Sequence, residues 1–116
     1  MKQQHIEDYL AKFPGSEGSY PFGPEALVYK VMGKMFALVA IHQGVPQVTY
    51  KCQPADGELL VSQFEGIIPG YHMNKRHWIT VSLSSDVNEA MLTDLADKSY
   101  QLVVSKLRKV DREALN

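Results

Sequence analysis

Apolar residues near the start of the chain follow the spacing of a helix. They recur three or four positions apart, at Ile6, Tyr9, Leu10 and Phe13. This spacing places their side chains on one face of a helix, and the Pro14-Gly15 pair directly after it is a helix stop signal. The pattern therefore predicts a short amphipathic helix over residues 3 to 13.

Three runs of strand-forming residues follow, at 26 to 32, 35 to 41 and 45 to 52. Short turns separate them, at Gly33-Lys34 and at His42-Gln43-Gly44. In the third run the apolar residues Val48, Tyr50 and Cys52 alternate with Gln47, Thr49 and Lys51. Alternation with period two is typical of a strand with one buried and one more solvated face. We therefore predict an antiparallel meander.

The segment before these strands, residues 16 to 24, reads SEGSYPFGP. It holds two prolines and two glycines, which favour turns over regular elements. We expect an ordered connecting loop that Tyr20 and Phe22 anchor to the rest of the domain.

The second half of the chain begins with a predicted helix from Pro54 to about Phe64, because proline is well tolerated in a first helical turn. Residues 66 to 75 are expected to form an irregular connection, which leads into a strand over residues 78 to 83. The residues of this strand expected to face the core are Ile79, Val81 and Leu83.

A final helical region is predicted from apolar residues at near-helical spacing, namely Met91, Leu95, Leu102, Val103 and Leu107. Ser84 or Ser85 is expected to cap it, with one break near Asp97. Its acidic residues come first and its basic residues later, an order that suits the helix dipole. We interpret the late basic cluster as cations that the helix dipole stabilises at the C-terminal end, with phosphate contact as the alternative. The cluster consists of Lys106, Arg108, Lys109 and Arg112.

The predicted element order is helix, three strands, helix, strand, helix, which indicates an α+β fold built on an antiparallel sheet. The chain has 116 residues, a common size for one domain, so we predict a single domain over residues 1 to 116. Hydrophobic residues make up 45% and charged residues 22%, which is ordinary globular composition.

The net charge of −1 excludes the global basic excess of many nucleic-acid-binding proteins, so a partner of that kind requires a local basic patch. The single cysteine, Cys52, excludes an intramolecular disulfide and fits a reducing compartment. The longest uncharged apolar run, residues 35 to 41, is too short to span a bilayer, and the N-terminus lacks the apolar core of a signal peptide. We expect a cytoplasmic protein without membrane contact.

The most basic stretch of the chain is YHMNKRHW, residues 71 to 78, and no acidic residue occurs from 66 to 85. Lys75 and Arg76 can neutralise phosphates, and Trp78 can stack on a base. This mixture of residue types favours nucleic-acid contact. The alternative is a solvated turn in which Trp78 anchors the following strand.

Strand alternation adds a second indication. If Ile79 and its alternate neighbours face inward, Trp78, Thr80 and Ser82 point outward. By the same count, four residues of neighbouring strands share that outer face: Lys30, Gln47, Thr49 and Lys51. We therefore expect an aromatic ring and lysines on one open surface.

No pattern of metal ligation or catalysis is present in the sequence. His72 and His77 are five positions apart, and His5 and His42 lie in other predicted elements, so no recognised metal-ligand spacing occurs. Cys52 falls on the predicted core side of its strand, which indicates a structural thiol. Neither a G-x-S-x-G elbow, a phosphate-binding glycine loop nor an H-E-x-x-H helix occurs. We predict no metal, no cofactor and no enzymatic activity.

Three blocks of the sequence resemble the MmcQ/YjbR family of small bacterial proteins, whose fold is similar to the CyaY/frataxin type. The blocks are Lys51-Cys52-Gln53-Pro54, the stretch from 69 to 81, and Ser99-Tyr100-Gln101-Leu102-Val103. The resemblance covers nearly the whole chain. It implies an antiparallel sheet with helices packed on one face and a DNA-binding role.

By this resemblance, five residues match the motif of the family: His72, Asn74, Lys75, His77 and Trp78. Tyr71 and Arg76 lie at positions where the motif is more permissive. The iron chemistry of frataxin is not implied, because the first helix offers only Glu7 and Asp8 instead of a long acidic ridge. A fold analogy by itself does not establish a function.

The leading hypothesis is a small DNA-binding or regulatory protein. Its expected nucleic-acid-binding residues are His72, Asn74, Lys75, Arg76, His77 and Trp78, with Lys51 and Lys30 in support. The alternative is a protein-interaction or small-ligand module in which Asn74 and His77 bond the backbone of the turn. The partner is DNA under the first hypothesis and another protein or a small ligand under the second, and no residue pattern indicates an oligomeric state.

Overall fold

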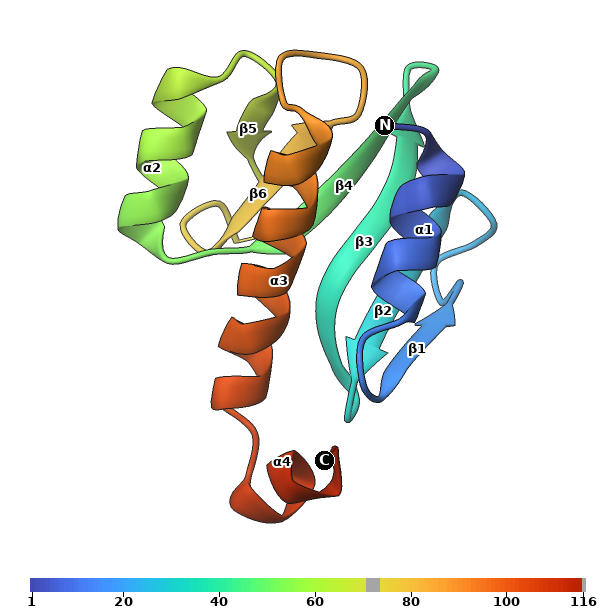
Figure 1. Cartoon of the computed structure of the whole chain (residues 1–116). Helices are drawn as coiled ribbons and strands as arrows, with labels where there is room; N and C mark the ends of the chain where they lie inside the picture. The colour runs from blue at the N-terminus through green and yellow to red at the C-terminus, as the bar shows by residue number, and fades with distance from the viewer. Residues whose placement is uncertain (71–73, 116) are drawn as a thin grey trace.

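The computed structural model describes residues 1–70 and 74–115 and shows one six-stranded antiparallel sheet with helices on one face (Figure 1). The spatial strand order is β1-β2-β3-β4-β6-β5, and every neighbouring pair is antiparallel. In chain order the elements are α1 (Gln3–Ala11), β1 (Ser16–Ser19), β2 (Ala26–Val31), β3 (Lys34–His42), β4 (Val45–Lys51), α2 (Pro54–Gln63), β5 (Ile67–Pro69), β6 (Trp78–Ser82), α3 (Glu89–Ser105) and α4 (Lys109–Ala114). The α+β class and the antiparallel sheet are therefore confirmed.

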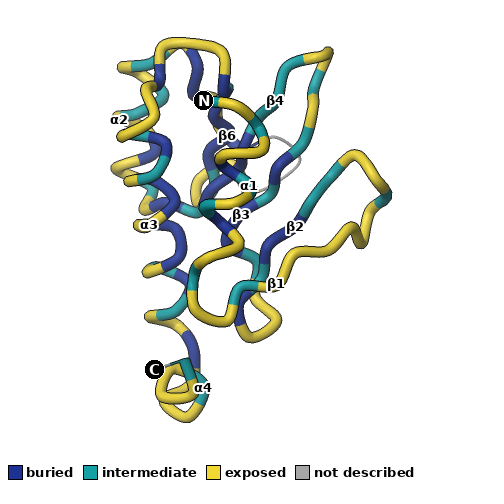
Figure 2. The backbone as a smooth tube through the Cα atoms, turned by 45° about the vertical axis from the view of Figure 1, so that its right-hand side comes forward, coloured by how far each residue is buried: buried dark blue, intermediate teal, exposed yellow. Residues whose placement is uncertain are grey.

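The helices divide the covered face of the sheet between them. Helix α3 lies across β3 and β4, α1 packs beside it, and α2 covers β5 and β6 (Figure 1). Buried backbone follows the central strands and the sheet-facing side of α3, whereas hairpin tips and α4 are exposed (Figure 2). The predicted core positions of β6 and its continuation are buried, as expected: Ile79, Val81 and Leu83.

Two tight hairpins build the central meander. In the β2–β3 turn Met32 and Gly33 have φ angles of 49° and 77°, and in the β3–β4 turn Gln43 and Gly44 have 51° and 80°. Two successive positive φ angles are the backbone of the type I′ turn, whose twist matches that of the flanking strands. Each turn occupies two residues. As a result β3 is one residue longer at each end than the predicted run 35 to 41, whereas β2 and β4 each end one residue before the predicted end.

The segment from 16 to 24 differs from the sequence prediction in two respects. Its first four residues form the edge strand β1, which pairs with β2 from Ser16↔Val31 to Ser19↔Val28. The backbone ladder with β2 supplies this strand, although its small and polar side chains do not favour one. The expected anchors also fail, because Tyr20 is 55% and Phe22 78% exposed.

Tertiary pairing also corrects the prediction for residues 66 to 75. Residues Ile67–Pro69 form strand β5, which pairs with β6 at the opposite edge of the sheet. Burial of Ile67 in the core holds this short strand in place. A three-residue strand is too short for its alternation to be recognised in the sequence.

The last helical region begins later and breaks later than predicted. The side chain of Asn88, instead of Ser84 or Ser85, caps α3 by accepting a hydrogen bond from the Met91 amide at 2.8 Å. The helix runs through Asp97 without a break, and the chain leaves helical geometry only after Ser105. Asp97 is well placed within the helix because its carboxylate accepts a 2.7 Å hydrogen bond from the hydroxyl of Tyr9 in α1.

A β-bulge in β3 changes how the sheet meets α3. Tyr29 pairs with Ala37 but Lys30 pairs with Met35, so Phe36 is the extra residue. Both Phe36 and Ala37 are buried. The ring of Phe36 meets those of Phe13 and Tyr100 edge-on, at centroid distances of 5.6 and 5.2 Å.

The hydroxyl of Ser99, which is fully buried on α3, bridges β3 and β4 beside this bulge. It donates a 2.6 Å hydrogen bond to the Phe36 carbonyl and accepts a 2.8 Å bond from the Lys51 amide. The β3–β4 ladder ends at the preceding pair, Ala37↔Tyr50. Beyond that pair the two strands part. Ser99 then provides the hydrogen-bond partner for the Phe36 carbonyl and the Lys51 amide, which no longer bond to each other.

The Ser99→Ala variant should be clearly less stable. It leaves the buried Lys51 amide and Phe36 carbonyl without their partner, at a cost of roughly 1–3 kcal/mol. We expect the melting temperature to fall by roughly 5–10 °C in a calorimetric scan. Ser105→Ala, at an exposed serine of the same helix, is the matched control and should change it little. Equal effects of the two variants would contradict the role assigned to Ser99.

Candidate functional site

A pocket opens where β3 and β4 part, on the side where the C-terminal end of α3 passes the sheet. Its volume is about 400 Å³, and its lining combines lysines with apolar and aromatic side chains. The lining residues are Lys34, Met35, Lys51, Trp78, Val103, Lys106 and Leu107. The parting of the strands beside Ser99 therefore creates the space that α3 and β6 then line.

A second pocket of about 320 Å³ adjoins the first and shares Lys51, Trp78 and Lys106 with it. It extends past the end of β4 to His77 and Asn74 at the start of β6. We call the two pockets together the basic groove, defined by Lys34, Lys51, His77, Trp78 and Lys106. The groove brings together residues from β3, β4, β6 and the end of α3.

The backbone around Trp78 fixes its side chain within the groove. Trp78 pairs directly with Lys51 across β4 and β6, so both side chains lie on the same face of the sheet. The Gly70 amide donates a 2.7 Å hydrogen bond to the Trp78 carbonyl. A Cβ atom at Gly70 would lie 2.6 Å from that of Trp78, so only glycine fits this close approach.

The charge of the basic groove is not compensated locally. Among the residues that the structure describes, no carboxylate lines either pocket. The three ion pairs found within residues 1–70 and 74–115 involve none of the groove lysines Lys34, Lys51 and Lys106. A chain of net charge −1 thus presents one locally positive surface beside an aromatic ring.

Three of the other predicted site residues lie outside the lining of the groove, whereas Asn74 lines its second pocket. Lys75 and Arg76 line a different pocket beside α2, together with Glu58. Asn74 has a structural role, since its side-chain oxygen accepts a 3.0 Å hydrogen bond from the Arg76 amide. Lys30 lies on the open face of β2 opposite Met35, next to the groove but outside its lining.

His72 falls outside the residues that the structure describes, so its predicted contribution remains a prediction. His77 is exposed and lines the groove. Its carbonyl accepts a 2.9 Å hydrogen bond from the Cys52 amide, which ties the start of β6 to the end of β4.

The open face of the sheet is less solvated than its alternation predicted. The register places Thr49 opposite Thr80, yet these two residues are only 4% and 2% exposed. Their hydroxyl groups hydrogen-bond to each other at 2.9 Å. The same-face neighbours of the pair are Lys51 and Trp78 on one side and Gln47 and Ser82 on the other.

Two groove residues were not recognised as binding residues from the sequence. Lys34 belongs to a predicted turn. For Lys106 the predicted role is that of a cation stabilised by the helix dipole, with phosphate contact as the alternative. The helical period could have indicated Lys106, because it follows Ser99 and Val103 at i+7 and i+3 and so lies on their side of α3. No local pattern could have shown that this side of the helix meets Lys51.

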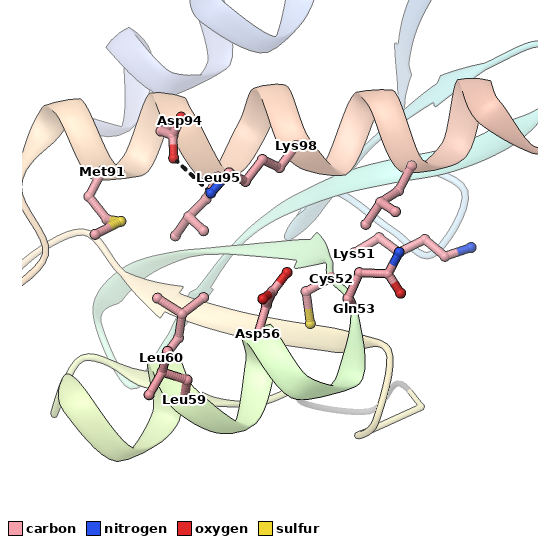
Figure 3. A pocket seen from close by; sticks show the side chains of 11 residues that line it. Lys51, Cys52, Gln53, Asp56, Leu59, Leu60, Met91, Asp94, Leu95 and Lys98 are labelled. Atoms are coloured by element: carbon pink, nitrogen blue, oxygen red, sulfur yellow. Dashed lines mark ion pairs between the residues drawn. The ribbon is translucent and has the colours of Figure 1, made fainter.

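A third pocket, of about 210 Å³, lies between α2 and α3 (Figure 3). Leucines from both helices form its walls, and the Asp56 side chain projects from α2 into the space below α3. Across it, Asp94 pairs with Lys98 at 3.3 Å. This pocket meets the groove at Lys51, and its own lining mixes both signs of charge, with Asp56 and Asp94 beside Lys98.

Cys52 sits at this junction as a buried thiol. Burial is the main cause that raises the pKa of its thiol, and the nearby carboxylate of Asp56 raises it further. A Cβ atom at Gly57 would lie 2.8 Å from the sulfur, which explains a glycine within α2. The raised pKa keeps the thiol protonated at neutral pH and therefore a poor nucleophile.

Across residues 1–70 and 74–115, no three histidine, cysteine, aspartate or glutamate side chains are grouped so that they could hold a metal ion. Nor does this part of the chain contain a helix that is long and apolar enough to cross a membrane.

Comparison with known proteins places this site within a family. The sequence profile of the YjbR family matches residues 11–102, so the chain belongs to the YjbR family. It is 42% identical over 102 residues to the protein YbdF of Escherichia coli O157:H7, which covers 88% of this chain and 84% of that protein. It is 35% identical over 115 residues to the protein YjbR of Escherichia coli strain K12, which covers 99% and 98% of the two chains.

Solved structures share the same fold. The crystal structure of the Deinococcus radiodurans protein DR2400, a DUF419 domain, matches with a TM-score of 0.86 and 36% identity, over 97% of this chain and 86% of that one. A crystal structure of a protein from Pseudomonas syringae matches with a TM-score of 0.78 and 30% identity, over 88% and 98%. The comparisons thus support the family and the fold predicted from the sequence.

The Cys52 thiol should react slowly in the folded protein. We expect labelling by an aromatic disulfide at pH 8 to be several-fold slower in native protein than in urea-unfolded protein. Because the folded pKa is raised, the native rate should still increase above about pH 9.5, where the thiolate of an unfolded chain, with a pKa of about 8.5, approaches saturation. Absorbance of the released thiol measures both rates, and identical pH profiles would contradict the buried environment.

Proposed function

We propose that this protein binds nucleic acid through the basic groove and acts as a binding protein and not as an enzyme. The observation that supports this proposal is the convergence of three lysines on one tryptophan, in a groove where none of the described lining residues is a carboxylate. Lysine ammonium groups attract phosphates, and an indole ring offers a surface for a base.

The distribution of charge supports a localised contact. Phosphate binding depends on the number of cations that reach the backbone, not on the net charge of the whole chain. Lys34, Lys51 and Lys106 come from three separate elements and converge only in the folded chain. The acidic remainder of the molecule favours binding in one orientation, with the groove toward the phosphates.

The alternative, a protein-interaction or small-ligand module, is favoured by one observation. The Asn74 side chain bonds the backbone of its own turn, so this motif residue is structural whatever the groove binds. Under that alternative the lysines have no role in nucleic-acid binding. Substitution of the lysines therefore separates the two functions.

The double variant Lys51→Gln with Lys106→Gln should weaken binding to nucleic acid. Each glutamine removes one phosphate-binding charge and keeps most of the side-chain length. We expect the slope of log affinity against log salt to become shallower by about 2, with the largest loss at low salt. Fluorescence anisotropy of labelled oligonucleotides at about 50 and about 200 mM salt measures this change.

The matched control is Lys75→Gln with Arg76→Gln, which removes the same charge from the neighbouring pocket beside α2. This control should retain most of the affinity if the groove is the contact site. Equal losses in both variants would indicate non-specific attraction to overall charge. Absence of binding by the unchanged protein at tens of micromolar would reject the proposed function.

A further inference from the structure

We propose that the basic groove selects unpaired nucleotides, with one base stacked on Trp78 and its flanking phosphates on Lys51 and Lys106. This inference rests on the proposed function and specifies its ligand as single-stranded nucleic acid. It follows from the place of Trp78 in the groove, the size of the pockets and the charges at their ends.

The tryptophan lines the same two pockets as the two lysines. Lys51 is its direct partner across β4 and β6, and Lys106 lines both of the pockets that Trp78 lines. A ring flanked by ammonium groups matches the alternation of base and phosphate along one strand. Proteins that bind single strands combine aromatic platforms with cationic grooves in this way.

A base pair within a duplex cannot use such a ring. Stacked base pairs present only their edges in the grooves, and the neighbouring pairs cover their faces. To reach Trp78, a duplex would have to unstack at a cost of about a few kcal/mol per step. An unpaired base already offers its face, so the concave position of Trp78 favours single strands.

The dimensions of the groove agree with a small occupant. Its two pockets have volumes of about 400 and 320 Å³ and overlap at Lys51, Trp78 and Lys106. Pockets that hold individual small ligands have volumes of roughly 300–1,000 Å³. The groove can therefore receive one or two nucleotide units, whereas the width of a duplex leaves its bases outside.

Charges at the two ends of the groove orient the strand. Toward α2 the groove meets the pocket in which Asp94 pairs with Lys98 and the carboxylate of Asp56 repels phosphates. Away from it, the groove continues to Lys34 at the start of β3. We therefore place the nucleic-acid strand from Lys51 toward Lys34, where it contacts only a few nucleotides' length of groove.

The protein contains a single tryptophan, so its intrinsic fluorescence reports on Trp78 alone. The unchanged protein is titrated with an oligothymidylate, with a hairpin duplex of equal charge, and with an abasic strand that carries the phosphates without bases. We expect tryptophan quenching that saturates with the oligothymidylate and is at least severalfold weaker with the other two. Anisotropy of labelled strands measures affinity in parallel.

The Trp78→Leu variant tests the stacking directly by anisotropy. It should bind oligothymidylate about ten- to hundredfold more weakly, because stacking on one base accounts for an affinity of that order. Trp78→Tyr keeps an aromatic platform and should recover most of this loss. Circular dichroism of both variants shows whether they are folded, and binding of the abasic strand should be the same in each.

The outcomes separate this inference from the proposed function. Equal affinity for duplex and single strand, without quenching, would overturn the preference for unpaired bases and leave nucleic-acid binding in place. If no strand binds, both fail. If the abasic strand quenches and binds as well as oligothymidylate, the groove recognises phosphates only, and stacking on Trp78 is rejected.

Discussion

The hydroxyl of Ser99 joins two strands that no longer pair with each other. It donates to the Phe36 carbonyl in the bulge of β3 and accepts from the Lys51 amide at the end of β4. A buried amide or carbonyl without a partner is costly, so the strands can part here only because α3 supplies this group. The same contact holds α3 across the sheet. The last turn of α3 then covers the gap between β3 and β4. The basic groove is the direct result.

The groove illustrates how a chain of slightly negative net charge can present a cationic surface. Lys34, Lys51 and Lys106 are separated widely in the sequence. Folding places the nearest pocket acids, Asp56 and Asp94, beyond the junction at Lys51. The charges close to the groove therefore determine its electrostatic potential more than the net charge of the chain does, because salt screens exposed charges beyond about 10 Å.

Membership of the YjbR family establishes the fold of this chain, and the solved structures from Deinococcus radiodurans and Pseudomonas syringae share it over most of their length. Function has to be argued from the site, since one fold serves many activities. In this chain the candidate site consists of Trp78 and the lysines beside it. The motif residue Asn74 contributes through the backbone of the turn, so this motif position has a structural role.

The sequence by itself determined the main helices and strands, the burial of Ile79 and Val81, and the placement of Trp78 on the same face as Lys51. These features follow from local periodicity, because alternate strand residues always point to opposite faces. Tertiary structure alone decided that β1 and β5 form, that Lys106 joins Lys51, and that Lys75 and Arg76 face α2 instead. Each of these depends on contacts between distant segments: backbone pairing at the sheet edges and the crossing of α3 over the bulge, which no local pattern of residues encodes.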